Sequence, residues 1–406
     1  MITSSPSPSS IILRSNIRHL YFDVFWWGIL AGSTIAFLGV YATRLGATSL
    51  QVGLLTALPA VANLAISLPA GRWLEGRSLI RATLTSSIGQ RAGYLLMILL
   101  PWLLPGARQM WALELLVLVM SAPGTVLAIS FNSMFAQIVP PEHRGRVVGQ
   151  RNVLLAIGVT TSSLLCGQLL DWDKLAFPLN YQVVFAIGVA GAALSSYHLS
   201  RIRAPIASPP HRQPARPVKR PWLRLGLLRG TFGPFMAVYL AFYTCQYIPT
   251  PLFPLAFVRE LHLTDGAISL GNALYYASML LASMRLGRMS ERWGHRRVLI
   301  VGALLYGIYP FLIGSAHAVT LFWVASAIGG GTWALAGAGL LNRLMERVPP
   351  DDLPTHMALH NLVLNLGTLS GSLIGPVLGN AVGLRPALWI AGGLRLLSGA
   401  LFGVWG

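Results

Sequence analysis

The sequence predicts an all-α membrane protein with twelve transmembrane helices arranged as two six-helix pseudo-symmetric bundles. Of its 406 residues, 54% are hydrophobic and only 10% are charged, and the mean hydropathy is +0.62. A soluble domain would carry roughly 25% charged residues. Apolar runs of about 20 residues, the length needed to cross a bilayer, recur along the whole chain. In addition, one charged loop between two such runs occurs twice.

The repeated loop reads GRWLEGRSLIR at Gly71–Arg81 and GRMSERWGHRR at Gly287–Arg297. The two copies align without a gap and share a glycine, two arginines and a glutamate. A second repeat pairs Val-Pro-Pro-Glu at 139–142 with Val-Pro-Pro-Asp at 348–351. Two related halves of this kind are typical of transporters built from parallel repeats about an axis normal to the membrane.

The first half begins with a Ser/Pro-rich stretch, Met1–Ile12, which we expect to be disordered. The first apolar run is long and lacks a small-residue cleavage site, so we expect it to remain as an anchor. The six predicted helices of this half lie near Phe22–Thr43, Ser49–Gly71, Ala82–Leu104, Gln109–Asn132, Gly145–Leu170 and Asn180–Ser200.

A basic segment, Arg201–Arg229, then separates the halves with six prolines, eight Arg or Lys residues and no acid. This composition is typical of a linker. The predicted domains are therefore an N-terminal bundle (1–200), a cytoplasmic linker (201–230) and a C-terminal bundle (231–406). The second set of helices lies near Phe232–Val258, Asp265–Gly287, Val298–Ser315, Ala318–Leu341, Thr355–Val382 and Pro386–Trp405.

The positive charges indicate the orientation. Most of the thirty Arg and Lys residues fall on the side of the N-terminus, and the formal net charge is +18. The opposite side carries only Arg44, Arg108, Lys174, Arg259 and Arg385. By the positive-inside rule, both termini are expected in the cytoplasm. Because orientation accounts for the basic excess, we expect no nucleic-acid partner.

At these loops the chain resembles the major facilitator superfamily, whose loop between helices 2 and 3 has the form G-x-x-x-[DE]-R-x-G-[RK]-x-[RK]. The later copy matches at Gly287, Glu291, Arg292, Gly294 and Arg297 and departs at His295. The first copy keeps Gly71, Glu75 and Arg81 but has Gly76 and Arg77 at departing positions. Pro141–Gly145 resembles the loop after helix 4 of that family.

The resemblance implies that these loops hold the cytoplasmic side closed. Each acid would face the positive N-terminal end of a helix in the other half, near Thr355 or Gly145. The alternative is that the loops carry only topogenic charge. The candidate residues of this cytoplasmic gate are Gly71, Arg72, Glu75, Arg81, Arg144, Gly287, Arg288, Glu291, Arg292 and Arg297.

In the family fold, helices 1, 4, 7 and 10 line the cargo cavity. Three tyrosines of helix 7 at i, i+4 and i+8 share one helix face, although such a stripe also suits ordinary packing. Together with residues of helices 1, 10 and 11 they predict an aromatic, mostly uncharged cavity suited to amphipathic cargo. The candidate substrate-binding residues are Ser33, Phe37, Glu114, Tyr239, Tyr243, Tyr247, Trp333 and Asn365.

Charges inside predicted spans are costly and are therefore functional candidates. Glu114, about one turn inside helix 4, is the candidate for proton coupling; the alternative is an interfacial glutamate paired with Arg108. We expect Asp23 to be a loop-end acid at the mouth of helix 1. Arg91 and Arg395 are expected to pair with helix-end carbonyls or polar neighbours rather than with cargo.

Two features of helix 11 have structural interpretations. Its small-residue pattern from Gly371 to Gly379 resembles a motif known from helix 5 of drug antiporters, and it predicts close packing, here with helix 2. His356 and His360 have a metal-compatible spacing with no acid between them. We expect them to be a polar cap, and we predict no metal and no cofactor.

The sequence therefore predicts a monomeric secondary transporter of the bacterial cytoplasmic membrane that works by alternating access. The first hypothesis is proton-coupled efflux of a small amphipathic compound. The alternatives are import of a neutral solute such as a sugar, or a non-transporting sensor or assembly protein with the same fold. No G-x-S-x-G, GK[ST] or H-E-x-x-H motif is present, so we do not expect an enzyme.

Overall fold

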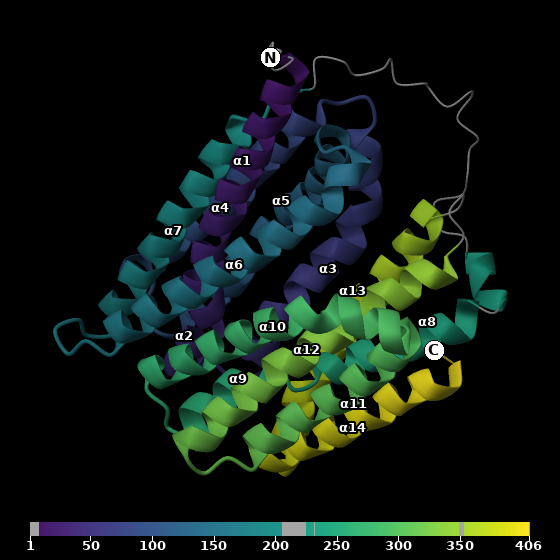
Figure 1. Cartoon of the computed structure of the whole chain (residues 1–406). Helices are drawn as coiled ribbons and strands as arrows, with labels where there is room; N and C mark the ends of the chain where they lie inside the picture. The colour runs from purple at the N-terminus through teal and green to yellow at the C-terminus, as the bar shows by residue number, and fades with distance from the viewer. Residues whose placement is uncertain (1–7, 205–224, 231, 349–352, 406) are drawn as a thin grey trace, which may run out of the picture.

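The computed structural model describes residues 8–204, 225–230, 232–348 and 353–405. Over these ranges, twelve helical segments run across the molecule (Figure 1). Those of the N-terminal half are α1 (Pro8–Leu30), which continues through η1 (Ala31–Ile35) into α2 (Ala36–Arg44), and α3 (Ser49–Leu74), α4 (Leu79–Leu103), α5 (Ala107–Ile138), α6 (Pro141–Leu170) and α7 (Leu179–Ser200).

The C-terminal half follows a short 3-10 turn, η2 (Leu225–Arg229). Its first segment is divided into α8 (Phe232–Tyr247), α9 (Leu252–Leu255) and η3 (Ala256–Glu260). The remaining segments are α10 (Asp265–Trp293), α11 (His295–Gly314), α12 (Val319–Arg347), α13 (Leu353–Val382) and α14 (Leu384–Trp405). The predicted all-helical architecture of twelve segments is thus confirmed.

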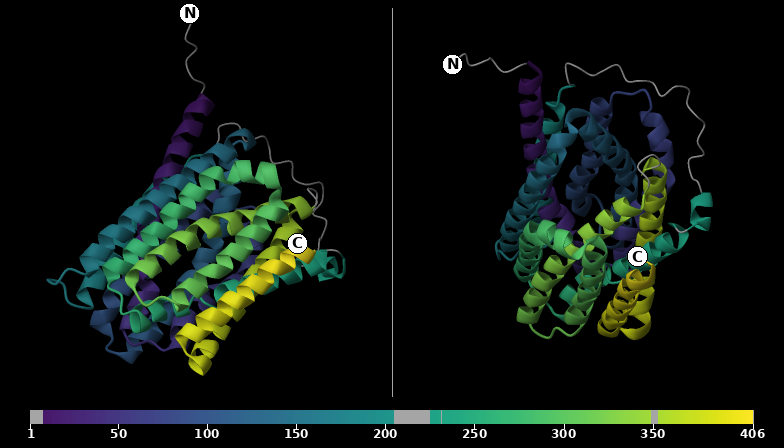
Figure 2. Two further views of the ribbon diagram at one scale, coloured as in Figure 1. Left: turned by 60° about the horizontal axis from the view of Figure 1, so that its bottom comes forward. Right: turned by 45° about the vertical axis from the view of Figure 1, so that its right-hand side comes forward.

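Ten of these segments are long and apolar enough to cross a membrane by length and composition alone, in the described part of the chain. The other two are α4, which contains Gln90 and Arg91, and the divided seventh segment, whose α8 has 16 residues. Both lie among the remaining helices of their own half (Figure 2). Neighbouring helices therefore supply the partners that a lipid environment would not.

The two main departures from the predicted boundaries are in the first and seventh helices. The first helix begins at Pro8 rather than near Phe22, so residues 8–12 are helical, while residues 1–7 lie outside the described part of the chain. In these extra turns His19 contacts His198 of α7, and the Leu20 carbonyl accepts a hydrogen bond from Arg151 of α6. Polar groups of this segment therefore have partners in the protein, which hydropathy does not take into account. Helix 7 is divided after Tyr247, because Pro249, Pro251 and Pro254 interrupt its backbone hydrogen bonding.

The repeat is visible in the local structure of both halves. Thr48 caps α3 by accepting a hydrogen bond from the backbone N–H of Gln51, and Thr264 caps α10 through the N–H of Ala267. The loops that follow turn at different residues, since positive φ angles occur at Gly76 (72°) and Gly294 (77°). In the second half, α10 consequently continues further before the turn than α3 does in the first half.

The apolar cores show that the two ends of the molecule are packed differently. We call the end where α1 begins and α14 finishes the terminal end, and the opposite one the far end. One cluster at the far end joins both halves, with Phe37 and Tyr41 from the first and Leu252, Phe257 and Phe322 from the second. Toward the terminal end, the described residues form separate clusters in the two halves.

The outer surface of the bundle is apolar. On α5, Trp111, Leu115 and Val119 are about 60% exposed and follow one helix face. The opposite face buries Leu113 and Val117. Exposed aliphatic and aromatic stripes of this kind are compatible with lipid as the surrounding solvent.

Candidate functional site

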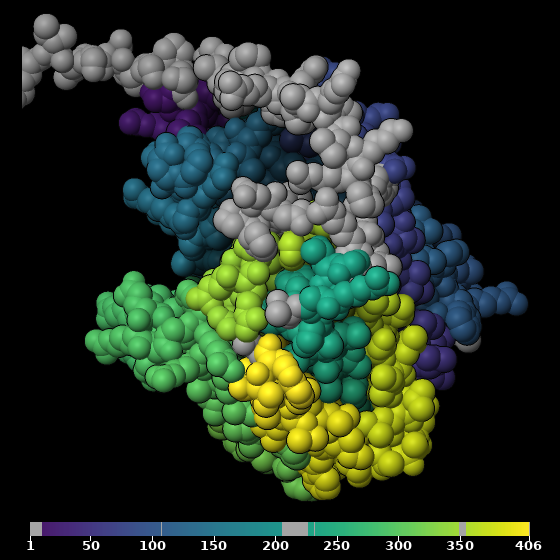
Figure 3. Space-filling view, turned by 90° about the vertical axis from the view of Figure 1, so that its right-hand side faces the viewer, coloured from purple at the N-terminus to yellow at the C-terminus, as the bar shows by residue number. Residues whose placement is uncertain are grey.

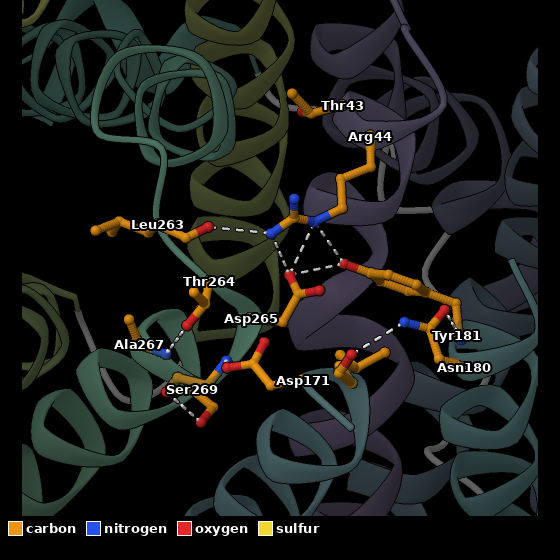
Figure 4. A network of polar contacts seen from close by, with 12 residues as sticks. Thr43, Arg44, Asp171, Asn180, Tyr181, Leu263, Thr264, Asp265, Ala267 and Ser269 are labelled. Carbon is orange, nitrogen blue, oxygen red and sulfur yellow. Dashed lines mark hydrogen bonds and ion pairs between the residues drawn. The ribbon is translucent and has the colours of Figure 1, made fainter. Parts of the chain in front are cut away.

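An ion pair closes the far end between the two halves (Figure 4). Arg44, the last residue of α2, places Nη2 2.8 Å from Oδ1 of Asp265, the first residue of α10. The Tyr181 hydroxyl donates to the same oxygen at 2.8 Å. Arg44 also donates to the carbonyl of Leu263 at 3.1 Å. Because the Asp265 side chain is only 6% exposed, this pair lies largely out of water.

Three further hydrogen bonds join the halves at the same end. Arg259 Nη2 donates to the Ala47 carbonyl at 2.6 Å, and Ser49 Oγ donates to Asn380 Oδ1 at 2.6 Å. The Gly266 amide donates to Asp171 Oδ2 at 2.9 Å, at the N-terminus of α10. The far end is therefore closed by polar contacts as well as by the shared apolar cluster.

A cavity of about 540 Å³ lies between the halves toward the terminal end. Its walls come from the later parts of α3 and α5 and the start of α13. Its polar atoms belong to uncharged side chains, and one contact crosses the space, from Asn361 Nδ2 to Ser67 Oγ at 3.5 Å. The lining residues are Asn63, Leu64, Ser67, Leu68, Thr125, Ala128, Ile129, Asn132, Ser133, Met357, Ala358, Asn361 and Leu362.

The aromatic candidates for cargo binding lie mostly in packed regions. Phe37 and Tyr239 are fully buried, and the Tyr239 hydroxyl donates to the Leu340 carbonyl at 2.7 Å. Tyr243 shares a 2.9 Å hydrogen bond with His360, and Tyr247 is half-buried. Trp333 packs at 5.1 Å from the Tyr306 ring. The structure thus brings Tyr239 and Tyr243 together, whereas Phe37 lies in the other half.

The two polar candidates differ in their position. Ser33 is buried in η1 and donates to the Ile29 carbonyl at 2.6 Å. Asn365 lies one turn beyond the cavity residue Asn361 and donates to its carbonyl at 2.8 Å. Asn365 is therefore hydrogen-bonded to a residue of the cavity wall. The cargo-binding roles remain predictions.

Glu114 is buried on the inner side of α5, with 3% exposure. Its Oε1 has no hydrogen-bond partner, and no ion pair with Arg108 is formed among the described residues. Glu114 and Thr125 are three helical turns apart on α5 and share a face, and Thr125 lines the cavity. The glutamate therefore lies between the cavity and the closed far end.

The predicted gate residues lie at the terminal end, mostly exposed. Within the described chain, neither Glu75 nor Glu291 forms an ion pair, and Arg144 donates to the carbonyls of Ala136 and Val139 at the end of α5. Figure 3 shows the α10–α11 end, in green, projecting from the body of the molecule. The gate contacts expected between the halves remain a prediction.

Asp23 is not a loop-end acid as predicted from the sequence. It lies inside the lengthened first helix at 4% exposure, accepts a 2.5 Å hydrogen bond from Ser195, and faces Arg91 and Arg151. Arg91 bonds the hydroxyls of Ser195 and Ser196, as expected of a polar partner. The sequence could not predict that these side chains lie together, because they come from four different helices.

The fold is that of a helical membrane protein with a cavity between its two halves. A model of the Major Facilitator Superfamily matches residues 24–244 and 235–406. The chain therefore belongs to the Major Facilitator Superfamily, and it is a multi-pass membrane protein.

Similar solved structures agree on the fold. A variant of the nucleoside transporter NupG has a TM-score of 0.74 at 13% identity, over 96% of this chain and 99% of that one. A bacterial homologue of the human lysosomal transporter Spinster, in an inward-facing and unoccupied conformation, has a TM-score of 0.70 at 14% identity, over 99% and 98% of the two chains.

A sequence relative is Multidrug resistance protein 1 of Bacillus subtilis (strain 168), 27% identical over 73 residues. This match covers 18% of the present chain and 19% of that protein. The chain thus matches about a fifth of the length of this relative.

Proposed function

We propose that this protein exports a small amphipathic compound across the bacterial cytoplasmic membrane by alternating access, driven by the proton gradient. The observation that carries the proposal is the contrast between the two ends. The Arg44–Asp265 pair joins the halves at the far end, while a cavity of about 540 Å³ separates them toward the terminal end. Such a contrast is what one of two alternating states requires.

The distribution of positive charge supports an orientation with both termini in the cytoplasm. The cavity then faces the cytoplasm, and opening of the far end would release cargo outside. The 201–230 segment would connect the two halves on the cytoplasmic side. The protein would work as a monomer and without enzymatic activity.

The cavity wall favours amphipathic cargo. Leu64, Leu68 and Ile129 supply apolar surface, whereas Asn63 and Asn361 supply amide donors and acceptors. A wall that combines apolar surface with uncharged polar groups can contact both parts of an amphipathic molecule. The partial similarity to a multidrug resistance protein favours efflux over the alternative, import of a neutral solute such as a sugar.

Glu114 is the proposed coupling residue. A buried carboxylate without a counter-ion or full hydrogen bonding is unfavourable. Binding a proton would remove the charge, and the position between the cavity and the far end would let the residue respond to both. Protonation and release at this site would then accompany each transport cycle.

The test is dye accumulation in efflux-deficient cells that express the protein, with and without a protonophore. We expect protonophore-sensitive export that is lost in Glu114→Gln and retained in the control Glu346→Gln, which removes an exposed acid of α12. Export that persists in Glu114→Gln would remove this glutamate from coupling. Uptake of a labelled sugar without dye export would favour the importer. The absence of both activities would favour the sensor or assembly protein.

A further inference from the structure

A second cavity, of about 330 Å³, lies inside the N-terminal half and contains buried charges of both signs. Asp23 of α1, Arg91 of α4 and Arg151 of α6 all line it. Their side chains are 6%, 7% and 15% exposed. One carboxylate therefore faces two guanidinium groups, and the charged side chains of this cavity carry a net charge of +1.

Asp23 does not saturate the two arginines. Its closest approaches are 3.9 Å to Arg91 Nη2 and 3.6 Å to Arg151 Nη1, both longer than an ordinary charge-assisted hydrogen bond. The Arg91 Nη groups donate to Ser195 and Ser196, and Nε has no partner. Arg151 donates to the Leu20 carbonyl at 3.2 Å. Each guanidinium has five N–H donors, so capacity to donate remains.

Aromatic rings hold the two cations in place. The Arg91 guanidinium lies 5.9 Å from the Trp27 ring, and that of Arg151 lies 4.6 Å from the Phe131 ring. Trp27 and Phe131 both line the cavity. They supply apolar surface beside the charges, which is the combination that an amphipathic acid would contact.

This cavity adjoins the one between the halves. Ala128 and Asn132 of α5 line both, so the two cavities meet at this turn of α5. We propose that the Asp23–Arg91–Arg151 cavity binds a single oxyanion group, a carboxylate or a phosphate, and that this group belongs to the transported amphipathic compound. The inference rests on the proposed transport function and specifies its cargo class as monoanionic amphipaths.

Asp23 has a defined part in this arrangement. Its carboxylate occupies the side of the arginines that faces Ser195 and competes with an incoming anion for the same positive charge. Removing the charge with Asp23→Asn should strengthen anion binding. If Asp23 served only to neutralise the arginines, the same substitution would destabilise the protein without creating a stronger anion site.

The experiment measures equilibrium binding of radiolabelled 1-naphthoate to the detergent-purified full chain. The control ligand is 1-naphthalenemethanol, an uncharged compound of similar size. We expect saturable naphthoate binding that weakens about tenfold or more in Arg91→Gln and Arg151→Gln. We expect tighter binding in Asp23→Asn and no change in the control Arg285→Gln on α10. Arg151→Lys keeps the charge and tests the site if the glutamine variants fail to fold.

A thermal-shift readout accompanies binding, because a ligand that binds only the folded state raises the melting temperature. Naphthoate should stabilise Asp23→Asn more than the wild type. Naphthoate binding that is indifferent to both arginines would overturn the proposal. Equal binding of the alcohol and the acid would do the same.

Anionic lipid is the other source of an oxyanion, so phosphatidylglycerol in mixed micelles is titrated against each variant. Arginine-dependent lipid binding without naphthoate binding would overturn the assignment to cargo. Uptake of naphthoate into proteoliposomes separates the two proposals. Arginine-dependent binding without transport would contradict the transport function, whereas export of uncharged dyes with arginine-independent naphthoate binding would contradict only this inference.

Discussion

At the scale of single residues, Arg44 and Asp265 differ from the other ion pairs at the far end because they belong to different halves. Arg385 and Glu260 form a comparable pair at 3.2 Å, but both lie in the C-terminal half. In the proposed alternating access, a contact between halves would stabilise one conformation, whereas a contact within one half would be kept as the halves move. The two pairs therefore provide a matched comparison.

Replacing Arg44 with Gln should destabilise the closed far end, since Asp265 would remain buried without its counter-ion. We expect a cost of about 1–3 kcal/mol to this state. The measurement is labelling of Thr43→Cys, a residue with 4% exposure, by a membrane-impermeant maleimide. Labelling should be about tenfold faster in the Arg44→Gln background. Arg385→Gln should leave the rate unchanged, and equal acceleration by both would contradict the account.

The residues of this pair could not be identified as partners from the sequence. Arg44 appears there as one of a few basic residues on the sparse side of the membrane, and Asp265 as the start of a helix. Thr48 and Thr264 are different, because their capping role depends only on neighbours in the chain. Local interactions can be predicted from spacing, whereas a contact between residues 221 positions apart requires the fold.

At the scale of elements, the divided seventh segment shows how a broken helix is stabilised. The prolines were visible in the sequence, but the partner of the freed carbonyls was not. Arg395 of α14, at 1% exposure, donates to the Gln246 carbonyl at 2.6 Å and lies 4.3 Å from the Tyr306 ring. The prediction of a helix-end carbonyl as its partner is confirmed. This bond fixes α8 where it ends.

The glycine pattern of α13 packs closely on α3, as predicted, since a Cβ on Gly53 of α3 would lie 2.6 Å from the Ser372 carbonyl. It also packs on α8: a Cβ on Gly371 would lie 2.3 Å from the Thr244 carbonyl, and one on Gly375 would lie 2.1 Å from the Ile248 carbonyl. Both acceptors flank the end of α8. The small residues thus also allow α13 to approach the broken helix closely, a neighbour that the spacing did not identify.

We expect Gly371→Ala to destabilise the protein by about 1–3 kcal/mol, because the added methyl group forces α8 and α13 apart. The matched control is Gly331→Ala on α12, where a Cβ meets no atom within 4 Å. That substitution should be neutral or stabilising, as alanine is the better helix former. Thermal unfolding of both purified variants provides the comparison. A control that loses as much stability as Gly371→Ala would show that packing against α8 is not the cause.

At the scale of the whole molecule, composition and the internal repeat were sufficient to predict twelve helices in two bundles. They did not determine which end is closed, because that depends on contacts between halves. The hydropathy pattern also placed the first helix too late, and this error hid Asp23 from the list of buried charges. Buried polar groups from several helices stabilise one another only after the bundle has formed.

The proposed orientation gives a separate expectation. Green fluorescent protein fused to the C-terminus should fluoresce, and alkaline phosphatase at the same position should be inactive, because we propose that both termini are cytoplasmic. Alkaline phosphatase inserted after Lys174, in the loop between α6 and α7, should be active. The reverse pattern would place the cavity on the outer side and would contradict the direction of export.

We propose that the two halves move against each other and that the Arg44–Asp265 pair holds one of the two states. The most direct measurement is the distance between spin labels in lipid nanodiscs, in a background in which Cys166 and Cys245 are replaced by alanine. Exposed positions are available at each end. Trp172→Cys with His317→Cys reports on the far end, and Arg77→Cys with Met345→Cys reports on the terminal end.

In the parent protein we expect a short far-end distance and a long terminal-end distance. Arg44→Gln should add a population in which the far-end distance is longer and the terminal-end distance is shorter, in equal proportion at the two ends. Unchanged distances in Arg44→Gln, or distances that lengthen together at both ends, would contradict alternating access governed by this pair.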